Sequence, residues 1–445
     1  MSTNLLGAAI LRLSHRAKAS RTLEVLREIR SEPYVSPEEA RARQLSRFKK
    51  LLRHCETAVP FYRRRFTELG VTSQDIRTWQ DVARLPILTK RNIAEHAEAM
   101  IAENFTRASL LTHHSGGSTG IPLRFYRDDS YLTASEAGTY RNLLQSGWRT
   151  GEMIAFFWGW NDKLAAMGRA EFFARQLARR MYQFDPFHSG EPDMATWWRT
   201  WRLIRPAVAH GYASTIARFA RYLEDRALRP RPLRGVFTTA EKLFPLQRML
   251  IERVFACRVF DCYGSSEVQN IATECAHGKM HINADFAVVE LQDAEREPNG
   301  AAPLLVTSLK NYAMPFLRYR NEDTGSLVEG SCDCGNGFPL MSLDVARVSD
   351  NFKLPNGRVV HGEFFTHLMY GSAGVESFQF HQVSSDTIIL RYVPATHGDP
   401  KAALAAAVSQ IEALAPGQLH VGVEAVSEIP LSSAGKHRFT RSEVA

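Results

Sequence analysis

The chain has 445 residues, of which 44% are hydrophobic and 23% charged, and its formal net charge is +8. These values exclude a disordered or fibrous protein and predict a globular chain of two or three domains. Six cysteines in so long a chain exclude a scaffold held together by disulfides, and no apolar run reaches the length of a transmembrane helix.

The positive charge is concentrated in residues 12–65 and 175–205. Solvated helix faces explain such charge, although nucleic acid, an anionic membrane surface or an acidic substrate would also be attracted by it. The apolar residues 5–11 precede Arg12 and Arg16, which is the reverse of the order in a secretory signal. We therefore expect a cytoplasmic protein.

The first predicted element is a helix over residues 36–66, within a helical N-terminal extension that covers residues 1–66. Ser36 can cap this helix, and Pro37 suits its first turn. Pro60 interrupts the helical pattern, because proline restricts both its own backbone and that of the preceding residue.

The middle of the chain alternates short apolar runs bounded by glycine with amphipathic stretches. This alternation predicts an α/β fold, in which mixed β-sheets are flanked by helices in a large N-terminal domain. The predicted strands are Ile154–Trp158, Gly235–Thr239, Val259–Tyr263 and Leu304–Ser308, and the predicted helices are 165–181, 213–225 and 244–255.

The C-terminal part of the chain has a different pattern. Hydrophobic residues alternate over 378–382, Thr387–Val393 is rich in β-branched residues, and 404–414 has one apolar helical face. We predict a small α+β domain over residues 346–445, which follows an N-terminal domain over residues 1–345.

A segment rich in glycine and serine, from His113 to Pro122, is the first candidate for chemistry. Its glycines allow the backbone to fold closely around an anion with several N–H groups pointing inward. The segment lacks the Gly-Lys-Ser/Thr sequence of a Walker loop, and a flexible surface loop is the alternative interpretation.

A second candidate is the strand end from Asp261 to Glu267. Tyr263 is suited to stack on a base, and Glu267 is suited to bind Mg²⁺. Taken alone, a Tyr-Gly turn followed by a glutamate is also typical of a purely structural turn.

Cysteine and histidine residues form a third candidate site. Cys275 and His281 lie in one segment, and Cys332 and Cys334 lie in another. Thiolate and imidazole ligands from two loops suit tetrahedral Zn²⁺, and four protein ligands would make the site structural. His277 competes with His281 as the ligand, and unrelated surface cysteines are the alternative.

Taken together, the motifs resemble those of adenylate-forming enzymes, in particular the phenylacetate–CoA ligase branch and its relatives in capsular polysaccharide biosynthesis. The resemblance covers nearly the whole chain. The segments that carry it are Val59–Tyr62, Leu85–Lys90, Ser115–Gly120, Gly211–Ser214, Thr239–Leu243, Tyr263–Glu267, Asn311–Pro315, Arg318–Arg320 and Ser433–Lys436.

The resemblance implies a role for each matching residue. ATP would be bound by Ser115, Gly116, Gly117, Ser118, Thr119, Gly120, Ala240, Glu241, Tyr263, Gly264, Ser265, Asp323 and Arg347. Glu267 would bind Mg²⁺, Asp350 would lie at the hinge of a mobile C-terminal domain, and Lys436 would be the catalytic lysine of that domain. Two positions depart from the family pattern, because Asn321-Glu322-Asp323 replaces Thr-Gly-Asp and Ala346 replaces a glycine.

The activity implied by the resemblance is activation of a small-molecule carboxylate by ATP, followed by transfer of the acyl group to CoA. Lys436 and Mg²⁺ would offset the charge repulsion between the carboxylate and the α-phosphate. The aromatic residues Trp158 and Tyr212 are the candidates for an acyl pocket, with His188 and His210 as weaker candidates and plain hydrophobic core as the alternative.

Two other functions remain open on the sequence alone. One is a ligase that transfers the acyl group to an amine, a sugar or a carrier. The other is a non-catalytic protein that binds nucleic acid or an anionic membrane, although no nucleic-acid-binding motif is found and we expect no nucleic-acid partner. The sequence leaves the oligomeric state open, a homodimer included.

Overall fold

A computed structural model describes residues 2–114, 123–158, 168–186, 191–296, 300–344, 352–357, 359–360, 365, 368–369, 372–395, 398–430 and 438–444. The described residues form two compact units. The first contains most of the chain up to Leu343, and the second contains Glu322–Thr324 and the chain from Asp344 onward. The domain boundary predicted at residue 345 lies outside the described residues and stays a prediction.

Helices dominate the beginning of the first unit. As predicted, Ser36 caps a helix that begins at Pro37, where the Ser36 hydroxyl accepts a hydrogen bond from the Glu39 N–H at 3.2 Å. Val59 then adopts an extended backbone ahead of Pro60, so the predicted helix is divided into α3 and α4. The helical elements before the sheet are α1 (Ser2–Ala17), α2 (Thr22–Ile29), α3 (Pro37–Ala58), α4 (Pro60–Leu69), η1 (Gln80–Arg84), α5 (Lys90–His96) and η2 (Arg107–Ser109).

Eleven strands form the large sheet within the described residues, in the order β10-β11-β12-β13-β9-β8-β7-β6-β5-β3-β4. The strands β4, β3, β5, β6 and β7 pair in parallel, and β8 and β9 continue the sheet in antiparallel pairing. The strands are β3 (Ile154–Phe157), β4 (Met181–Phe184), β5 (Val208–Tyr212), β6 (Gly235–Thr239), β7 (Val259–Tyr263), β8 (Ala272–Glu274), β9 (Met280–Ile282), β10 (Ala287–Leu291), β11 (Ala302–Ser308), β12 (Tyr319–Val328) and β13 (Leu340–Asp344).

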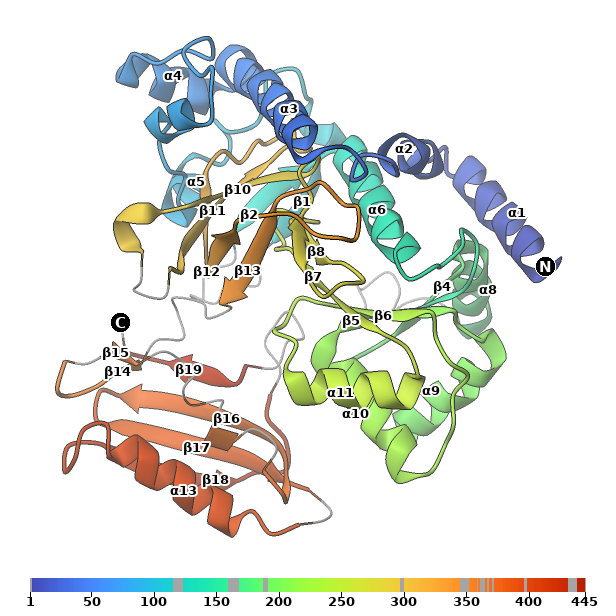
Figure 1. Ribbon diagram of the computed structural model, residues 1–445, viewed down its shortest axis with the longest axis vertical. Coiled ribbons are helices and arrows are strands. Elements are labelled where there is room, and N and C mark those ends of the chain that lie inside the picture. The colour runs from blue at the N-terminus through green and yellow to red at the C-terminus, as the bar shows by residue number, and fades with distance from the viewer. Residues whose placement is uncertain are drawn as a thin grey trace. The chain divides into compact units, whose positions relative to one another are not determined.

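Helices connect the parallel strands and cover both faces of this half of the sheet (Figure 1). Val236 and Val259 pack with residues of α9, α10 and α11, whereas their neighbours Phe237 and Phe260 pack with α2 and α6 on the opposite face. Side chains alternate in this way because successive residues of a strand point to opposite faces. The helices are α6 (Asp129–Leu144), α8 (Arg169–Arg179), α9 (Glu191–Ile204), α10 (Ala213–Asp225) and α11 (Pro245–Phe255), and η3 covers Asp293–Glu295.

The helix predicted over 165–181 extends too far at its C-terminal end. α8 ends at Arg179 because Arg180 adopts a left-handed backbone with φ of 54°, and β4 begins at Met181. Residues 165–167 lie outside the described part of the chain.

A separate two-stranded hairpin carries the glycine-rich segment between its strands. It pairs β1 (Leu111–His114) with β2 (Arg124–Arg127) in antiparallel register, so that His114 lies opposite Arg124 and Leu111 opposite Arg127. The His114–Arg124 pair is at the end of the hairpin that adjoins residues 115–122 in sequence, and Arg127 is at the other end.

The second unit has its own hydrophobic core, which includes Phe380, Leu390 and Ile411. β17 and β18 are parallel strands joined by α13, as the sequence pattern predicts, and they belong to a sheet of order β18-β17-β16-β19. The elements of this unit are β14 (Phe352–Lys353), β15 (Val359–Val360), β16 (Val375–Ser384), β17 (Thr387–Pro394), α13 (Lys401–Glu412), β18 (His420–Ala425) and β19 (Thr440–Ser442). Among the helices of the described residues, none combines the length and apolarity needed to cross a bilayer.

Candidate active site and metal centre

The predicted site residues of the first unit lie at one edge of the parallel strands. Trp158 follows β3, Tyr212 ends β5, Ala240 and Glu241 follow β6, and Tyr263 ends β7. The parallel registers align these ends, since Tyr212 pairs with Thr239 and Thr239 pairs with Cys262. The carboxyl edge of a parallel sheet is where ligands bind in open α/β folds.

Trp158 and Tyr212 form a stacked aromatic pair at this edge, in which Tyr212 is buried. Their rings stack with centroids 4.6 Å apart, and the Phe156 ring stacks on Trp158 at 5.6 Å. His210 lies 5.4 Å from Phe156, and burial lowers its pKa to about 4, which keeps the imidazole neutral near pH 7. The structure therefore brings together the two residues named for the acyl pocket. His188, a weaker candidate for the same pocket, lies outside the described residues.

Ala240 and Glu241 form a constrained turn after β6. Ala240 has φ of 69°, a left-handed backbone that is costly for a residue with a Cβ atom. Both carboxylate oxygens of Glu241 accept hydrogen bonds from Ser214, one from its N–H and one from its hydroxyl, each at 2.9 Å. Ser214 lies in the first turn of α10, where backbone N–H groups favour an anion. The Glu241 carboxylate therefore fixes the turn in place.

Tyr263 is held by Asn321, a residue that the sequence identified only as a departure from the family's Thr-Gly-Asp pattern. The Asn321 amide donates a hydrogen bond of 2.7 Å to the Tyr263 hydroxyl. The bond orients the phenol ring although the two residues are 58 positions apart in the chain. The departure from Thr-Gly-Asp was the available signal, but the sequence gives no information on the partner of Asn321.

Glu267 is buried in the loop between β7 and β8, with 6% of its surface exposed. The Tyr319 hydroxyl donates to its Oε1 at 3.2 Å, which leaves other lone pairs of the carboxylate for a cation. Ser265 stabilises the loop, because its N–H donates to the Val268 carbonyl at 2.8 Å and its hydroxyl accepts from the Val268 N–H at 3.0 Å. A Cβ atom at Gly264 would lie 3.2 Å from the Asn270 nitrogen, so the turn is tight at that position.

Asp261 gives this region a pH-dependent stability. Burial raises the pKa of Asp261 to about 6, although a hydrogen bond from the Thr238 hydroxyl opposes the shift. A folded-state pKa above the unfolded value means that the stabilisation is present below about pH 4 and is lost as the pH rises through about 6. We therefore expect the stability of wild type relative to Asp261→Asn, measured as the difference between their melting temperatures, to be greater at about pH 4.5 than at about pH 7. Equal differences at the two pH values would contradict a raised pKa.

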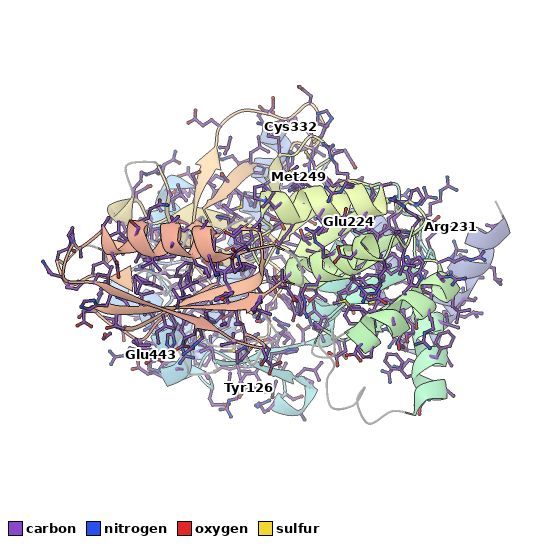
Figure 2. All side chains as sticks on the ribbon, turned by 90° about the horizontal axis from the view of Figure 1, so that it is seen from below. Tyr126, Glu224, Arg231, Met249, Cys332 and Glu443 are labelled. Carbon is purple, nitrogen blue, oxygen red and sulfur yellow. The ribbon has the colours of Figure 1, made fainter. Side chains whose placement is uncertain are left out.

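The four predicted zinc ligands converge in the first unit. Their donor atoms on Cys275, His281, Cys332 and Cys334 all lie within 4.8 Å of one another. Cys332 follows β12 in the chain and is labelled in Figure 2. The sulfur atoms of Cys275 and Cys332 are 3.7 Å apart, and the Cys334 sulfur is 3.4 Å from Nε2 of His281. For Zn–S bonds of about 2.3 Å, tetrahedral geometry places two sulfurs about 3.8 Å apart, so the donor set fits zinc.

His281 is the histidine in the cluster. Its Nδ1 lies 3.0 Å from the Phe338 carbonyl, which favours a proton on Nδ1 and a free lone pair on Nε2. Burial lowers the pKa of His281, which favours the neutral form that ligates metals. His277 contributes its backbone N–H to the Cys275 sulfur at 3.3 Å, and its side chain is not in the group of donors.

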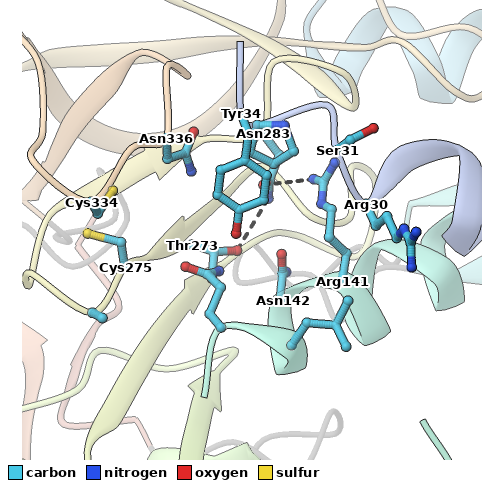
Figure 3. Close-up of a pocket in the computed structure, with 14 residues that line it drawn as sticks. Arg30, Ser31, Tyr34, Arg141, Asn142, Thr273, Cys275, Asn283, Cys334 and Asn336 are labelled. Atoms are coloured by element: carbon cyan, nitrogen blue, oxygen red, sulfur yellow. Dashed lines mark hydrogen bonds between the residues drawn. The ribbon is translucent and has the colours of Figure 1, made fainter. Parts of the chain in front are cut away.

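A cavity of about 430 Å³ lies beside the cluster and is lined in part by Cys275 and Cys334 (Figure 3). Arg141 forms an ion pair of 2.7 Å with Asp285 and donates to Asn283 at 3.0 Å. These bonds join Arg141, Asp285 and Asn283 in a buried polar network, in which Oδ1 of Asp285 has no partner among the described residues.

Of the remaining predicted site residues, Asp323 is described by the structure and the others are not. Asp323 is buried within β12. The predicted phosphate-binding residues Ser115–Gly120, together with Arg347, Asp350 and Lys436, lie outside the described residues.

The two-domain α/β architecture and the carboxyl-edge site define the class of protein as one with the fold of adenylate-forming ligases. A 2-hydroxyisobutyryl-CoA ligase, in the postadenylation state in complex with R3-HIB-AMP, superposes with a TM-score of 0.71 at 18% identity, over 93% of this chain and 91% of that one. No protein-family model matches the chain.

Two relatives show which proteins this chain resembles in sequence. CapK of Staphylococcus aureus is 23% identical over 423 residues, which is 90% of this chain and 89% of CapK. The phenylacetate–coenzyme A ligase of Thermus thermophilus is 28% identical over 335 residues, which is 70% of this chain and 71% of that enzyme. These similarities confirm the predicted resemblance to adenylate-forming enzymes and to their phenylacetate–CoA ligase branch.

Proposed function

We propose that the protein is an ATP-dependent acid–thiol ligase. In the first step a carboxylate oxygen attacks the α-phosphorus of ATP, which forms an acyl-adenylate and releases pyrophosphate. In the second step a thiolate, that of CoA, attacks the acyl carbon and AMP leaves. The observation that carries the proposal is the alignment of Trp158, Tyr212, Glu241 and Tyr263 at one sheet edge, in a chain similar to phenylacetate–CoA ligases along most of its length.

The described residues have distinct roles in this proposal. Tyr263, oriented by Asn321, stacks on the adenine, and the Ala240 turn forms a wall of the same pocket. Glu267 holds the Mg²⁺ that accompanies the nucleotide and offsets phosphate charge. Trp158 and Tyr212 cover the acyl chain.

Three residues outside this sheet edge also have roles in the proposed reaction. Asp323 binds the ribose hydroxyls, Lys436 stabilises the charge that develops on the α-phosphate, and Asp350 provides the hinge for domain movement between the two steps. Zn²⁺ at Cys275, His281, Cys332 and Cys334 is structural, because four protein ligands leave no open position for substrate. We propose the cytoplasm as its location, since both ATP and CoA are used.

The final acceptor has a second candidate. The similarity to CapK extends over 90% of the chain, against 70% for the phenylacetate–CoA ligase of Thermus thermophilus. An amine, a sugar or a carrier thiol is the alternative to CoA as the group that receives the acyl chain. Comparing product formation with each acceptor, after the acid has been found, separates these two functions.

The first reaction is tested by exchange of labelled pyrophosphate into ATP. We expect exchange that requires both Mg²⁺ and a carboxylate, found by screening aryl, short-chain and long-chain acids. Addition of CoA should then consume the adenylate and yield the thioester. Absence of exchange with every acid, together with salt-dependent retention on DNA or anionic vesicles, would instead favour the non-catalytic binding protein.

Glu267→Gln is expected to raise the Mg²⁺ concentration needed for half-maximal exchange by about 10-fold or more, because an amide oxygen is a weaker ligand than a carboxylate. The measurement is the exchange rate as a function of Mg²⁺ concentration. Tyr319→Phe is the matched control, since it removes the hydrogen bond to Glu267 but keeps the charge. An unchanged Mg²⁺ dependence in Glu267→Gln would remove Glu267 from the metal site.

A further inference from the structure

Arg127, the last residue of β2, is a buried cation whose hydrogen-bonding capacity is incompletely used. Only 3% of its surface is exposed. Its Nε and Nη2 atoms have no hydrogen-bond partner among the described residues. Buried polar groups are almost always paired, so two unpaired donors on one charged side chain call for an explanation.

The two unpaired atoms form one edge of the guanidinium. The Cζ atom of Arg127 lies over the Phe125 and Tyr131 rings, 4.9 Å and 5.0 Å from their centroids, so aromatic rings pack against the charge. Nε–H and the neighbouring Nη2–H point in the same direction, and this edge matches the two oxygens of a carboxylate. The side chain is therefore arranged to receive an oxyanion in its own plane.

The protein supplies no carboxylate for this edge. Within the described part of the chain no ion pair links Arg127 to an acidic residue, and burial lowers its pKa while Tyr131 and the Glu267 charge partly restore it. Leaving a buried charge without a partner is strongly unfavourable. A bound anion would remove this cost.

The location of Arg127 indicates which anion it meets. Arg127 lies against the Tyr131 ring, and the Tyr131 hydroxyl accepts a hydrogen bond of 3.0 Å from the N–H of Gln269, two residues after Glu267. The guanidinium therefore lies near the loop that carries Glu267, in the neighbourhood of the proposed reaction centre. In the hairpin, Arg127 pairs with Leu111. This pair is three positions along the strand from the His114–Arg124 pair, which adjoins the glycine-rich segment in sequence. At about 3.3 Å per residue, this is about 10 Å from the end assigned to the ATP phosphates. A bidentate cation on the reacting carboxylate would also weaken that carboxylate as a nucleophile.

We infer that Arg127 binds a second carboxylate, or an equivalent oxyanion, of the acid that is activated, and that the preferred substrates therefore carry two anionic groups. The inference rests on the proposed ligase function and specifies its substrate class. One carboxylate reacts with ATP, and the other pairs with the free guanidinium edge. An acid with a single carboxylate leaves that edge unpaired.

The experiment compares pyrophosphate exchange for acids of equal chain length with one or two carboxylates, such as hexanoate and adipate. We expect wild type to favour the diacid in kcat/KM by about 10- to 100-fold. Arg127→Met should lose this preference with an unchanged KM for ATP, and Arg127→Lys should retain part of it. Arg124→Met is the control, because Arg124 lies in the same strand but is exposed and pairs with Glu98 at 3.4 Å.

Other outcomes would overturn the inference. An equal loss of kcat/KM for the monoacid and the diacid in Arg127→Met would assign Arg127 to the reacting carboxylate. A raised KM for ATP in this variant would assign Arg127 to the phosphates. A lower melting temperature of unliganded Arg127→Met with an unchanged acid preference would make the residue structural.

A direct binding measurement separates this inference from the proposed function. If no acid supports exchange, the ligase proposal fails. Calorimetry with adipate on wild type and Arg127→Met then still tests the site, and equal heats for the two proteins would reject it.

Discussion

Lys436→Ala is expected to lower the rate of adenylate formation by about 10²- to 10³-fold, the usual cost of removing one preorganised charge from a transition state. In the proposed mechanism, the Lys436 ammonium group offsets negative charge while the carboxylate attacks the α-phosphate. Transfer of the acyl group from a preformed adenylate to CoA does not build that charge. We therefore expect the second step to keep nearly its wild-type rate, measured as thioester formation from synthetic acyl-adenylate.

Lys401→Ala is a matched control for this variant. Lys401 is an exposed lysine at the start of α13 in the same unit, and it should leave both steps unchanged. Equal losses in the two steps for Lys436→Ala would mean a general defect instead of a role in adenylation. Full adenylation activity would remove Lys436 from the catalytic machinery.

Removal of the metal is expected to have the largest effect on stability. In the proposed zinc site, three thiolates and one imidazole would join the β8–β9 hairpin to the loop between β12 and β13. A structural zinc site contributes directly to the free energy of folding. We expect Cys332→Ser, or treatment with a strong chelator, to lower the melting temperature by about 10 °C or more. Metal analysis of the purified protein should give about one zinc per chain.

Cys257→Ser provides the comparison for the cluster. Cys257 is a free cysteine between α11 and β7, outside the group of metal ligands, and its substitution should change neither metal content nor melting temperature substantially. His277→Ala should likewise retain the metal, whereas His281→Ala should lose it. A protein that contains no zinc, or that melts at the same temperature after chelation, would contradict a structural zinc site.

Local patterns in the sequence were sufficient for much of the fold. The predicted helix 213–225 and the predicted strands Gly235–Thr239 and Val259–Tyr263 have the same limits in the structure. The C-terminal unit also follows its hydrophobic periodicity, because each pattern depends on neighbours within a few residues. Where the backbone leaves the common regions, as at Arg180, the limit of a helix could not be predicted, since an arginine gives no signal for a left-handed residue.

Prediction of the candidate site required both the local sequence motifs and the tertiary structure. The types of residue that ligate zinc and the Tyr-Gly turn with its glutamate were visible as motifs. Which histidine enters the metal cluster was decided by the pairing of β9 with β8 and β13, which directs His281 toward the cysteines and against the Phe338 carbonyl. Asn321 meets Tyr263 only because the fold brings these two residues into hydrogen-bond contact across 58 positions of sequence.

The sequence by itself determined the class of fold, the order of its elements and the chemical types of the site residues, because these depend on local spacing and on side-chain chemistry. The tertiary structure alone decided that His281 joins the three cysteines, that Asn321 orients Tyr263, and that one edge of the Arg127 guanidinium has no partner among the described residues. Each of these is a matter of distance between residues far apart in the chain. Such distances are fixed when strands pair and side chains are buried together, and no local pattern encodes them.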